Sequence, residues 1–142
     1  MDSLKLKVVI GRTEKVDFPK LGMYNIPAKI DTGAYSTAMH CNNIHEEDGV
    51  LHFKLADSSH PEYSSKELTF TEYTQKRVKN SFGEMELRYS IKTPVRIGKK
   101  LIKATISLTN RGSMKYPVLI GRTLLRNNFL VDVGLTDHLS IK

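Results

Sequence analysis

The Asp31-Thr32-Gly33 run has the clearest chemical use in the sequence, and it directly follows the apolar alternation at 26–30. An acid at a strand end can project into a cleft, and a neighbouring hydroxyl can hold the loop by hydrogen bonds. A glycine lets a second backbone or a substrate approach closely. Asp and Gly are also ordinary turn residues, so the tripeptide alone indicates only a turn.

A second feature lies about ninety residues later, where the apolar run 116–120 ends in Gly121-Arg122 and continues into Leu124-Leu125. In isolation this pattern is typical of a core strand followed by a helix that begins at a glycine. Together, the two features resemble the layout of retropepsins, which join an early Asp-Thr-Gly to a late apolar strand, a Gly-Arg pair and a short helix.

The resemblance is closer to the bacterial retropepsin-like family historically labelled "ATP-dependent zinc protease", and it spans nearly the whole chain. The residues that carry it are Lys29 to Ala34, Arg77-Val78-Lys79, Gly83, Arg88, Leu108 to Arg111, Met114, Tyr116, Pro117, Gly121 and Arg122. It implies an all-β fold, a retropepsin-like closed barrel with one short C-terminal helix. It also implies aspartic endopeptidase activity, a hydrolase function.

The resemblance assigns roles residue by residue. Asp31 becomes the catalytic acid, Thr32 the hydroxyl that ties two catalytic loops together across a dimer axis, and Gly33 a backbone contact to substrate. The remaining substrate contacts are expected from Ala34, a flap with Phe82-Gly83 at its tip, and the bases Lys79 and Arg88. Gly121 and Arg122 are expected to be structural residues near the site. Retroviral members carry an acid shortly after this run that pairs with the late arginine, whereas here Tyr35-Ser36-Thr37 follows, so Arg122 lacks that partner.

A single Asp-Thr-Gly has a consequence for assembly. Aspartic proteases use two close carboxylates that share one proton. The chain is therefore expected to form a homodimer about a two-fold axis between two copies of Asp31. Asp57 and Asp137 lie in polar loop contexts, and Asp132 is predicted to be an edge or turn acid.

The sequence contains no motif for the zinc or the ATP that the family label mentions. His-Glu-x-x-His is absent, and so are the two glycine-rich phosphate-binding patterns. His40, Cys41 and His45 form the nearest cluster of potential ligands, but their spacing matches no standard zinc module. The prediction is no metal and no cofactor.

Composition sets the broad class. With 142 residues, the chain is predicted to be one domain, 1–142. Neither a signal peptide nor a membrane-spanning segment is predicted, so a cytoplasmic protein without membrane contact is expected. The single cysteine, Cys41, excludes an intrachain disulfide and is predicted to be a buried or idle thiol.

The net charge of +7 is unevenly distributed. Residues 43–73 carry seven acids and two bases, whereas residues 76–103 carry nine bases and two acids. A solvated strand face explains the second segment, and a surface for acidic peptides is the functional alternative. Because members of the family are associated with ATP-grasp ligases that add glutamates to protein tails, the resemblance suggests acidic or glutamylated peptides as substrates and a functional link to such a ligase.

Two rival functions remain open. The first is an inactive protease-like module that binds or adapts. The second is a basic β-barrel that binds RNA, with Tyr73, Phe82 and Tyr89 as stacking residues. No nucleic-acid motif supports the second rival, so nucleic acid is not the expected partner.

Period-two alternation predicts the elements that must position these residues. Strands are expected at 4–10, 26–30, 36–39, 50–55, 68–73, 77–79, 84–91, 95–97, 101–108 and 116–120, a loop at 57–66 and a short helix at 122–127. The tetrapeptide Ile-Gly-Arg-Thr occurs at 10–13 and at 120–123, and its recurrence is interpreted as coincidence.

Overall fold

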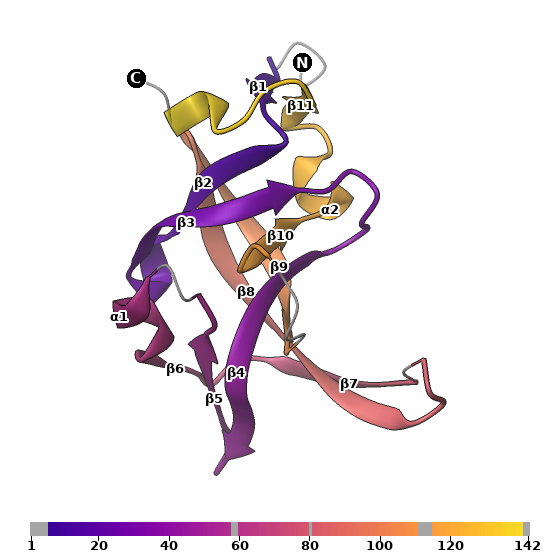
Figure 1. Cartoon of the computed structure of the whole chain (residues 1–142). Coiled ribbons are helices and arrows are strands. Elements are labelled where there is room, and N and C mark those ends of the chain that lie inside the picture. Colours follow the sequence, from indigo (N-terminus) through magenta and orange to yellow (C-terminus); the bar gives the residue numbers. More distant parts are fainter. Residues whose placement is uncertain (1–5, 58–59, 80, 111–114, 141–142) are drawn as a thin grey trace.

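The computed structural model describes residues 6–57, 60–79, 81–110 and 115–140, and it is built mostly of strands (Figure 1). The strands are β1 (Val8–Ile10), β2 (Thr13–Phe18), β3 (Met23–Ile30), β4 (Thr37–Glu47), β5 (Val50–Leu55), β6 (Glu67–Phe70), β7 (Thr74–Lys79), β8 (Met85–Ile97), β9 (Lys100–Thr109), β10 (Val118–Ile120) and β11 (Phe129–Val131). The helices are α1 (Pro61–Ser64) and α2 (Arg122–Leu125), with 3-10 turns at Pro19–Leu21 and His138–Ser140.

Six strands close into a barrel in the order β10, β3, β2, β8, β9, β4, with β4 returning to β10. Closure removes the free edges that an open sheet would leave. The strands β5 and β6 extend the sheet from β4, and β7 pairs with the first half of β8. The expected closed barrel is confirmed, although a second short helix, α1, lies inside the region 57–66 that was predicted to be a loop.

The strand β10 lies between β3 and β4, parallel to the first and antiparallel to the second. Because β3 and β4 are consecutive in the chain, the segment 31–36 that joins them must cross the end of β10. This arrangement places the Asp31 segment directly beside the Gly121-Arg122 pair that follows β10, as the two sequence features suggested (Figure 1).

The core is formed by alternate residues of the barrel strands together with those of β5 and the end of β1. The fully buried large side chains are Ile10, Phe18, Met23, Ile26, Met39, Leu51, Phe53, Leu55, Ile91, Ile97, Ile106 and Ile120. Each such side chain contributes about 1.5–3 kcal/mol by leaving water. Cys41 belongs to this core, which confirms the predicted buried thiol, and its burial raises the pKa of the thiol far above its ordinary value.

The strand β2 was not predicted, because its inward positions are occupied by Glu14, Val16 and Phe18. Because Glu14 is charged, the sequence of this strand does not show the alternation of apolar and polar residues by which strands were predicted. Glu14 is fully buried and accepts hydrogen bonds from the backbone N–H groups of Gly11, His138 and Leu139, at 2.8, 3.1 and 3.0 Å. Three donors replace the water that this carboxylate loses.

Other boundaries also differ from the predictions. The strand β4 extends to Glu47, β8 is continuous through Pro94, and β11 was not predicted. The predicted start of the first strand at residue 4 lies outside the described residues, as do Arg111 and Met114 of the family pattern. Within the described residues, no helix is both long and apolar enough to span a membrane.

Candidate active site

The Asp31 loop is held mainly by backbone hydrogen bonds. The N–H of Asp31 donates to the carbonyl of Ile120 at 2.9 Å, so the loop starts on the last residue of β10. The N–H of Gly33 donates to Oδ1 of Asp31 at 2.9 Å, and the N–H of Ala34 donates to the carbonyl of Asp31 at 3.2 Å. One carboxylate oxygen is thereby fixed in an Asx turn, so the carboxylate is oriented by its own loop.

Gly121 brings β10 and the Asp31 loop into van der Waals contact. A Cβ atom at this position would lie 2.3 Å from the carbonyl oxygen of Ser36, which is closer than any side chain permits. The Gly121 N–H donates to the buried hydroxyl of Thr37 at 3.2 Å. The next two N–H groups, of Arg122 and Thr123, donate to the carbonyls of Ala34 and Tyr35 at 2.9 and 3.0 Å.

The Arg122 side chain has a role that does not need the missing acid. Its Nη1 donates to the carbonyl of Thr32 at 3.1 Å, and its guanidinium lies over the Tyr35 ring, 5.8 Å from the centroid. Arg122 therefore fastens the backbone on the far side of Asp31. Thr32 and Gly33 are exposed and Asp31 is half-buried, so this part of the loop faces outward.

A second Asp-x-Gly loop, at 132–135, is held in the same way by the first Ile-Gly-Arg-Thr copy. The N–H of Asp132 donates to the carbonyl of Ile10 at 2.9 Å, and the N–H of Gly134 donates to Oδ1 of Asp132 at 2.9 Å. The N–H of Leu135 donates to the carbonyl of Asp132 at 3.1 Å. These bonds repeat those of Asp31, Gly33 and Ala34, and they confirm Asp132 as a turn acid.

The glycine and arginine of the two tetrapeptides also correspond. A Cβ at Gly11 would lie 2.5 Å from the Leu135 carbonyl oxygen, and the Arg12 N–H donates to that same oxygen at 2.8 Å. Nη1 of Arg12 donates to the carbonyl of Val133 at 3.2 Å, as Nη1 of Arg122 does to that of Thr32. The interpretation of the repeat as coincidence was wrong, because both copies perform the same structural task.

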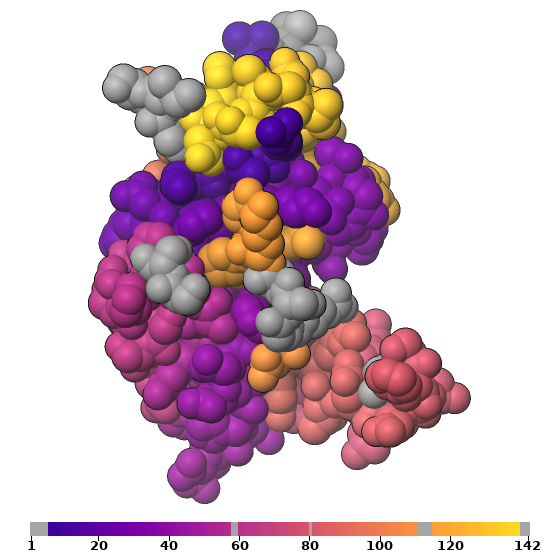
Figure 2. Space-filling view, viewed as in Figure 1, coloured from indigo at the N-terminus to yellow at the C-terminus, as the bar shows by residue number. Residues whose placement is uncertain are grey.

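The predicted flap is the β7–β8 hairpin, which projects from the body as a separate lobe below the Asp31 loop (Figure 2). At its tip, Phe82 is 87% exposed and Gly83 has a φ of 81°. At its base, Glu46 of β4 accepts hydrogen bonds from the Tyr73 hydroxyl and from Nε2 of Gln75. The bond to Glu46 raises the pKa of Tyr73 to about 12.

The two predicted substrate-binding bases lie on opposite faces of this hairpin. Lys79 pairs with Met85, whereas Arg88 pairs with Lys76 and forms an ion pair with Glu86 at 3.1 Å. Because side chains alternate along β8, Met85 shares a face with the core residue Ile91 and Arg88 points the other way. Lys79 and Arg88 are therefore not expected to contact the same stretch of a substrate.

A cavity of about 520 Å³ lies beside β3 and brings together bases that sequence reasoning did not select. It is lined by Arg12, Thr13, Lys29, Ile30, Lys115, Tyr116, Val118 and Leu119. Ile30 immediately precedes Asp31, and the lining contains three basic side chains and no acid. The register shows why they meet, since Lys29 pairs with Thr13 on one side and with Leu119 on the other. Only the pairing of β2 with β3, which was not predicted, could have revealed this cluster.

Comparison with known proteins identifies relatives of this arrangement. The family model described as "Retropepsin-like aspartic endopeptidase RimB" matches residues 9–139. A crystal structure of a Legionella pneumophila protein of unknown function has a TM-score of 0.73 and 28% sequence identity, and the match covers 94% of this chain and 99% of that one.

Curated relatives are longer proteins. A Shewanella halifaxensis protein named probable alpha-L-glutamate ligase is 34% identical over 134 residues, which make up 89% of this chain and 28% of that protein. A Desulfotalea psychrophila protein of the same name is 29% identical over 133 residues, 91% of this chain and 29% of that protein. The chain thus spans less than a third of the length of these relatives. With the family model covering nearly all of the barrel and both Asp-x-Gly loops, the chain belongs to the RimB-like family of retropepsin-like proteins.

Proposed function

We propose that this protein is an aspartic endopeptidase that acts as a homodimer and cleaves acidic or glutamylated peptides. The observation that carries the proposal is the Asp31 loop. Its carboxylate is held at a half-exposed position by backbone bonds to Ile120 and Gly33, while the Thr32 hydroxyl side of the loop is exposed. A rigidly held carboxylate with an outward-facing neighbour is suited to meet a second copy of itself.

The surface around the chain ends supports the dimer. The strands β1 and β11 form a separate two-stranded parallel sheet (Figure 1), and among the described residues neither strand pairs with a further one. Four apolar side chains on or next to this sheet are 40–86% exposed, namely Leu6, Val9, Leu130 and Val133. Exposed apolar edge strands tend to pair with another chain, which here would be a second protomer.

In the proposed mechanism, two Asp31 carboxylates approach across the two-fold axis and hold one proton between them. The ionised member accepts a proton from a water molecule as that water attacks the scissile carbonyl. The protonated member donates a hydrogen bond to the carbonyl oxygen and stabilises its developing charge. Bonds from Arg122 and Gly121 keep the loop in place, so little reorganisation is needed during the reaction.

The cavity next to Ile30 supports an acidic substrate. Arg12, Lys29 and Lys115 line the cavity together with apolar side chains, and such a site can bind the methylene groups of a glutamate side chain while pairing its carboxylate. The glutamate ligase names of the longer relatives agree with this chemistry. On this basis, the partner of the site is a peptide rich in glutamate.

The proposed activity is tested with purified protein and an oligoglutamate-tailed peptide, with products identified by mass spectrometry. Asp31→Asn should abolish cleavage without altering the circular dichroism spectrum, because the amide oxygen still accepts the Gly33 N–H. Mixing wild-type and variant chains should give heterodimers of low activity. Cleavage by Asp31→Asn at the wild-type rate would exclude Asp31 as the catalytic acid.

The proposed specificity is tested by the ratio of kcat/KM for matched acidic and neutral peptides. Lys29→Glu should reduce that ratio about tenfold or more, since it replaces an attraction of at least about 1.4 kcal/mol with a repulsion. Arg88→Glu is the matched control, because Arg88 is not among the residues that line this cavity and is already paired with Glu86. Added salt should also reduce the wild-type ratio, with screening over about 10 Å at 0.1 M ionic strength. An equal ratio in both variants would disprove the assignment of the cavity.

A second candidate is a non-catalytic module that holds an acidic chain for a ligase. The observation that favours it is that the similar region occurs within longer proteins named as ligases. Such a module would bind an oligoglutamate peptide equally well with Asp31→Asn and would cleave none. RNA binding is less favoured, because Tyr73 and Tyr89 pack on each other and against the core, leaving only Phe82 of the three aromatics well exposed.

A further inference from the structure

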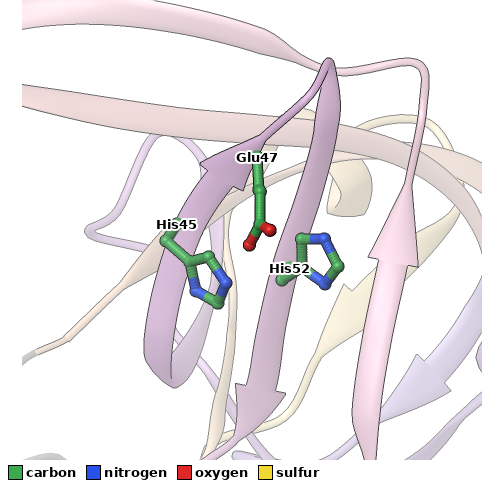
Figure 3. A group of neighbouring side chains, drawn as sticks. All are labelled: His45, Glu47 and His52. Atoms are coloured by element: carbon green, nitrogen blue, oxygen red, sulfur yellow. The ribbon is translucent and has the colours of Figure 1, made fainter.

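The far end of the β4–β5 hairpin brings together two imidazoles and one carboxylate. His45 and Glu47 lie on β4 and His52 lies on β5, with the Glu47 carboxylate close to both rings (Figure 3). One ligand atom from each of the three residues lies within 4.8 Å of the others. The two rings are nearly parallel, with centroids 4.9 Å apart.

Hairpin register explains why these residues meet. The turn at Asp48-Gly49, with φ of 52° and 75°, joins strands in which His45 pairs directly with His52. His45 and Glu47 are two residues apart on one strand and so share its face. A register shift between Asn42 and His45 changes the direction in which the following side chains of β4 point. His45 and Glu47 are therefore exposed, while Ile44 packs against the core.

Each ring already has a partner on one nitrogen. Nδ1 of His45 lies 2.8 Å from the carbonyl of Asn43, and Nδ1 of His52 lies 3.1 Å from Oε1 of Glu67. A carbonyl and a carboxylate are the usual outer partners of metal-binding histidines, because they fix the tautomer that leaves Nε2 as a lone-pair donor. Among the described residues, Nε2 of neither ring makes a hydrogen bond.

We propose that His45, Glu47 and His52 form a binding site for Zn²⁺ or a similar transition-metal ion, with Nε2 of each histidine and one Glu47 oxygen as ligands. Two imidazoles and a carboxylate form a common zinc set, and water completes the tetrahedron. Nitrogen ligands disfavour Ca²⁺ and Mg²⁺, which prefer oxygen. Since both hairpin strands present these side chains at the surface, small torsional changes bring the donors to bonding distance.

The site is separate from the proposed catalytic loop. His45 is eight residues along β4 from Thr37, or roughly 25 Å at about 3.3 Å per residue. The ion therefore fastens the hairpin and takes no part in peptide hydrolysis. Glu46 lies between His45 and Glu47 in sequence and points to the other face of β4. There it accepts hydrogen bonds from Tyr73 and Gln75, so the proposed metal site lies next to the base of the β7–β8 hairpin, the predicted flap. The earlier candidate set is excluded, because Cys41 is buried in the core while His45 is exposed.

The test is titration of the full chain, stripped of metal, with Zn²⁺ in a calorimeter and with Co²⁺ in the visible absorption spectrum. One ion per chain should bind, Co²⁺ should give the intense bands of a tetrahedral site, and Ca²⁺ and Mg²⁺ should not compete. His45→Ala and His52→Ala should each weaken Zn²⁺ binding at least 100-fold. Glu67→Gln should weaken it about tenfold, because it alters only the partner of His52.

The matched control is His138→Ala, which removes an exposed histidine outside the cluster and should bind Zn²⁺ as tightly as wild type. Thermal unfolding gives a second readout, since Zn²⁺ should raise the Tm of wild type and of His138→Ala but not that of His52→Ala. Two outcomes overturn the proposal: wild type binding no Zn²⁺ at 100 µM, or the His45 and His52 variants binding it as tightly as wild type.

Discussion

The loops at 31–36 and 132–135 have the same pattern of backbone hydrogen bonds but different surroundings. Each rests on an Ile-Gly-Arg-Thr segment, and each has an aspartate whose Oδ1 accepts the N–H of the glycine two residues later. Thr32, however, is replaced by Val133 in the second loop. An Asp-x-Gly turn is thus a way of building a tight loop. It becomes a candidate catalytic site only when neighbouring residues supply reactive or hydrogen-bonding groups, such as the Thr32 hydroxyl.

The two loops also differ in how the strands that support them are paired. The first loop spans β10, which is paired on both sides by β3 and β4 inside the closed barrel. The second loop rests on β1, which belongs to a two-stranded sheet. A carboxylate held by two flanking strands is better pre-organised than one held by a single strand. The comparison predicts that equivalent substitutions will have unequal effects.

The largest difference is expected between Asp31→Asn and Asp132→Asn. Both amides can still accept the glycine N–H, so both variants should fold with nearly wild-type Tm. Asp31→Asn should reduce kcat by at least about 100-fold, the typical contribution of a general base, whereas Asp132→Asn should stay within about twofold of wild type. The measurement is steady-state cleavage of the acidic peptide. Similar losses in the two variants would mean that the loops are functionally equivalent.

The two glycines should show an intermediate difference. Gly121→Ala and Gly11→Ala each force a Cβ against a backbone carbonyl, at 2.3 and 2.5 Å, so each should lower the free energy of unfolding by roughly 2–4 kcal/mol. Only Gly121→Ala displaces the Asp31 loop itself and should also remove most activity of the folded fraction. Urea unfolding together with activity per folded molecule checks this prediction. Gly49→Ala, at a turn position with a φ of 75° and open space around it, gives the cost of backbone strain without a clash. Full activity in folded Gly121→Ala would contradict the role assigned to the close contact.

The smallest difference concerns the residue between aspartate and glycine. Thr32→Val removes the hydroxyl proposed to link two protomers and should weaken dimerisation about tenfold, which corresponds to about 1.4 kcal/mol. Val133→Thr is the reciprocal change on the apolar surface proposed to face the second protomer, and because it keeps the branched shape it should weaken dimerisation less than Thr32→Val does. Sedimentation velocity over a concentration series measures both. An unchanged dissociation constant in Thr32→Val would remove the hydroxyl from the dimer contact.

Much of the candidate site could be predicted from local sequence. Apolar alternation indicated β3, β5, β9 and β10, and the Asp31-Thr32-Gly33 run together with Gly121-Arg122 indicated two segments that would meet. These signals are local, since they depend on a period of two and on turn residues. The hairpin register was also available, because the Asp48-Gly49 turn pairs His45 with His52 by simple counting, although the metal prediction considered only neighbours in sequence.

The all-β class and the Asx turn at Asp31 were therefore determined by the sequence itself, because period-two alternation and the bond from the Gly33 N–H to Asp31 involve residues close together in the chain. Only the tertiary structure decided what Glu14, Arg122 and the two Ile-Gly-Arg-Thr copies do. Glu14 is acceptable inside the barrel because two of its three N–H donors, those of His138 and Leu139, come from the far end of the chain. Arg122 needs no acid because a carbonyl in the Asp31 loop accepts its hydrogen bond. Those partners come from segments up to 125 residues away, and no local pattern specifies them.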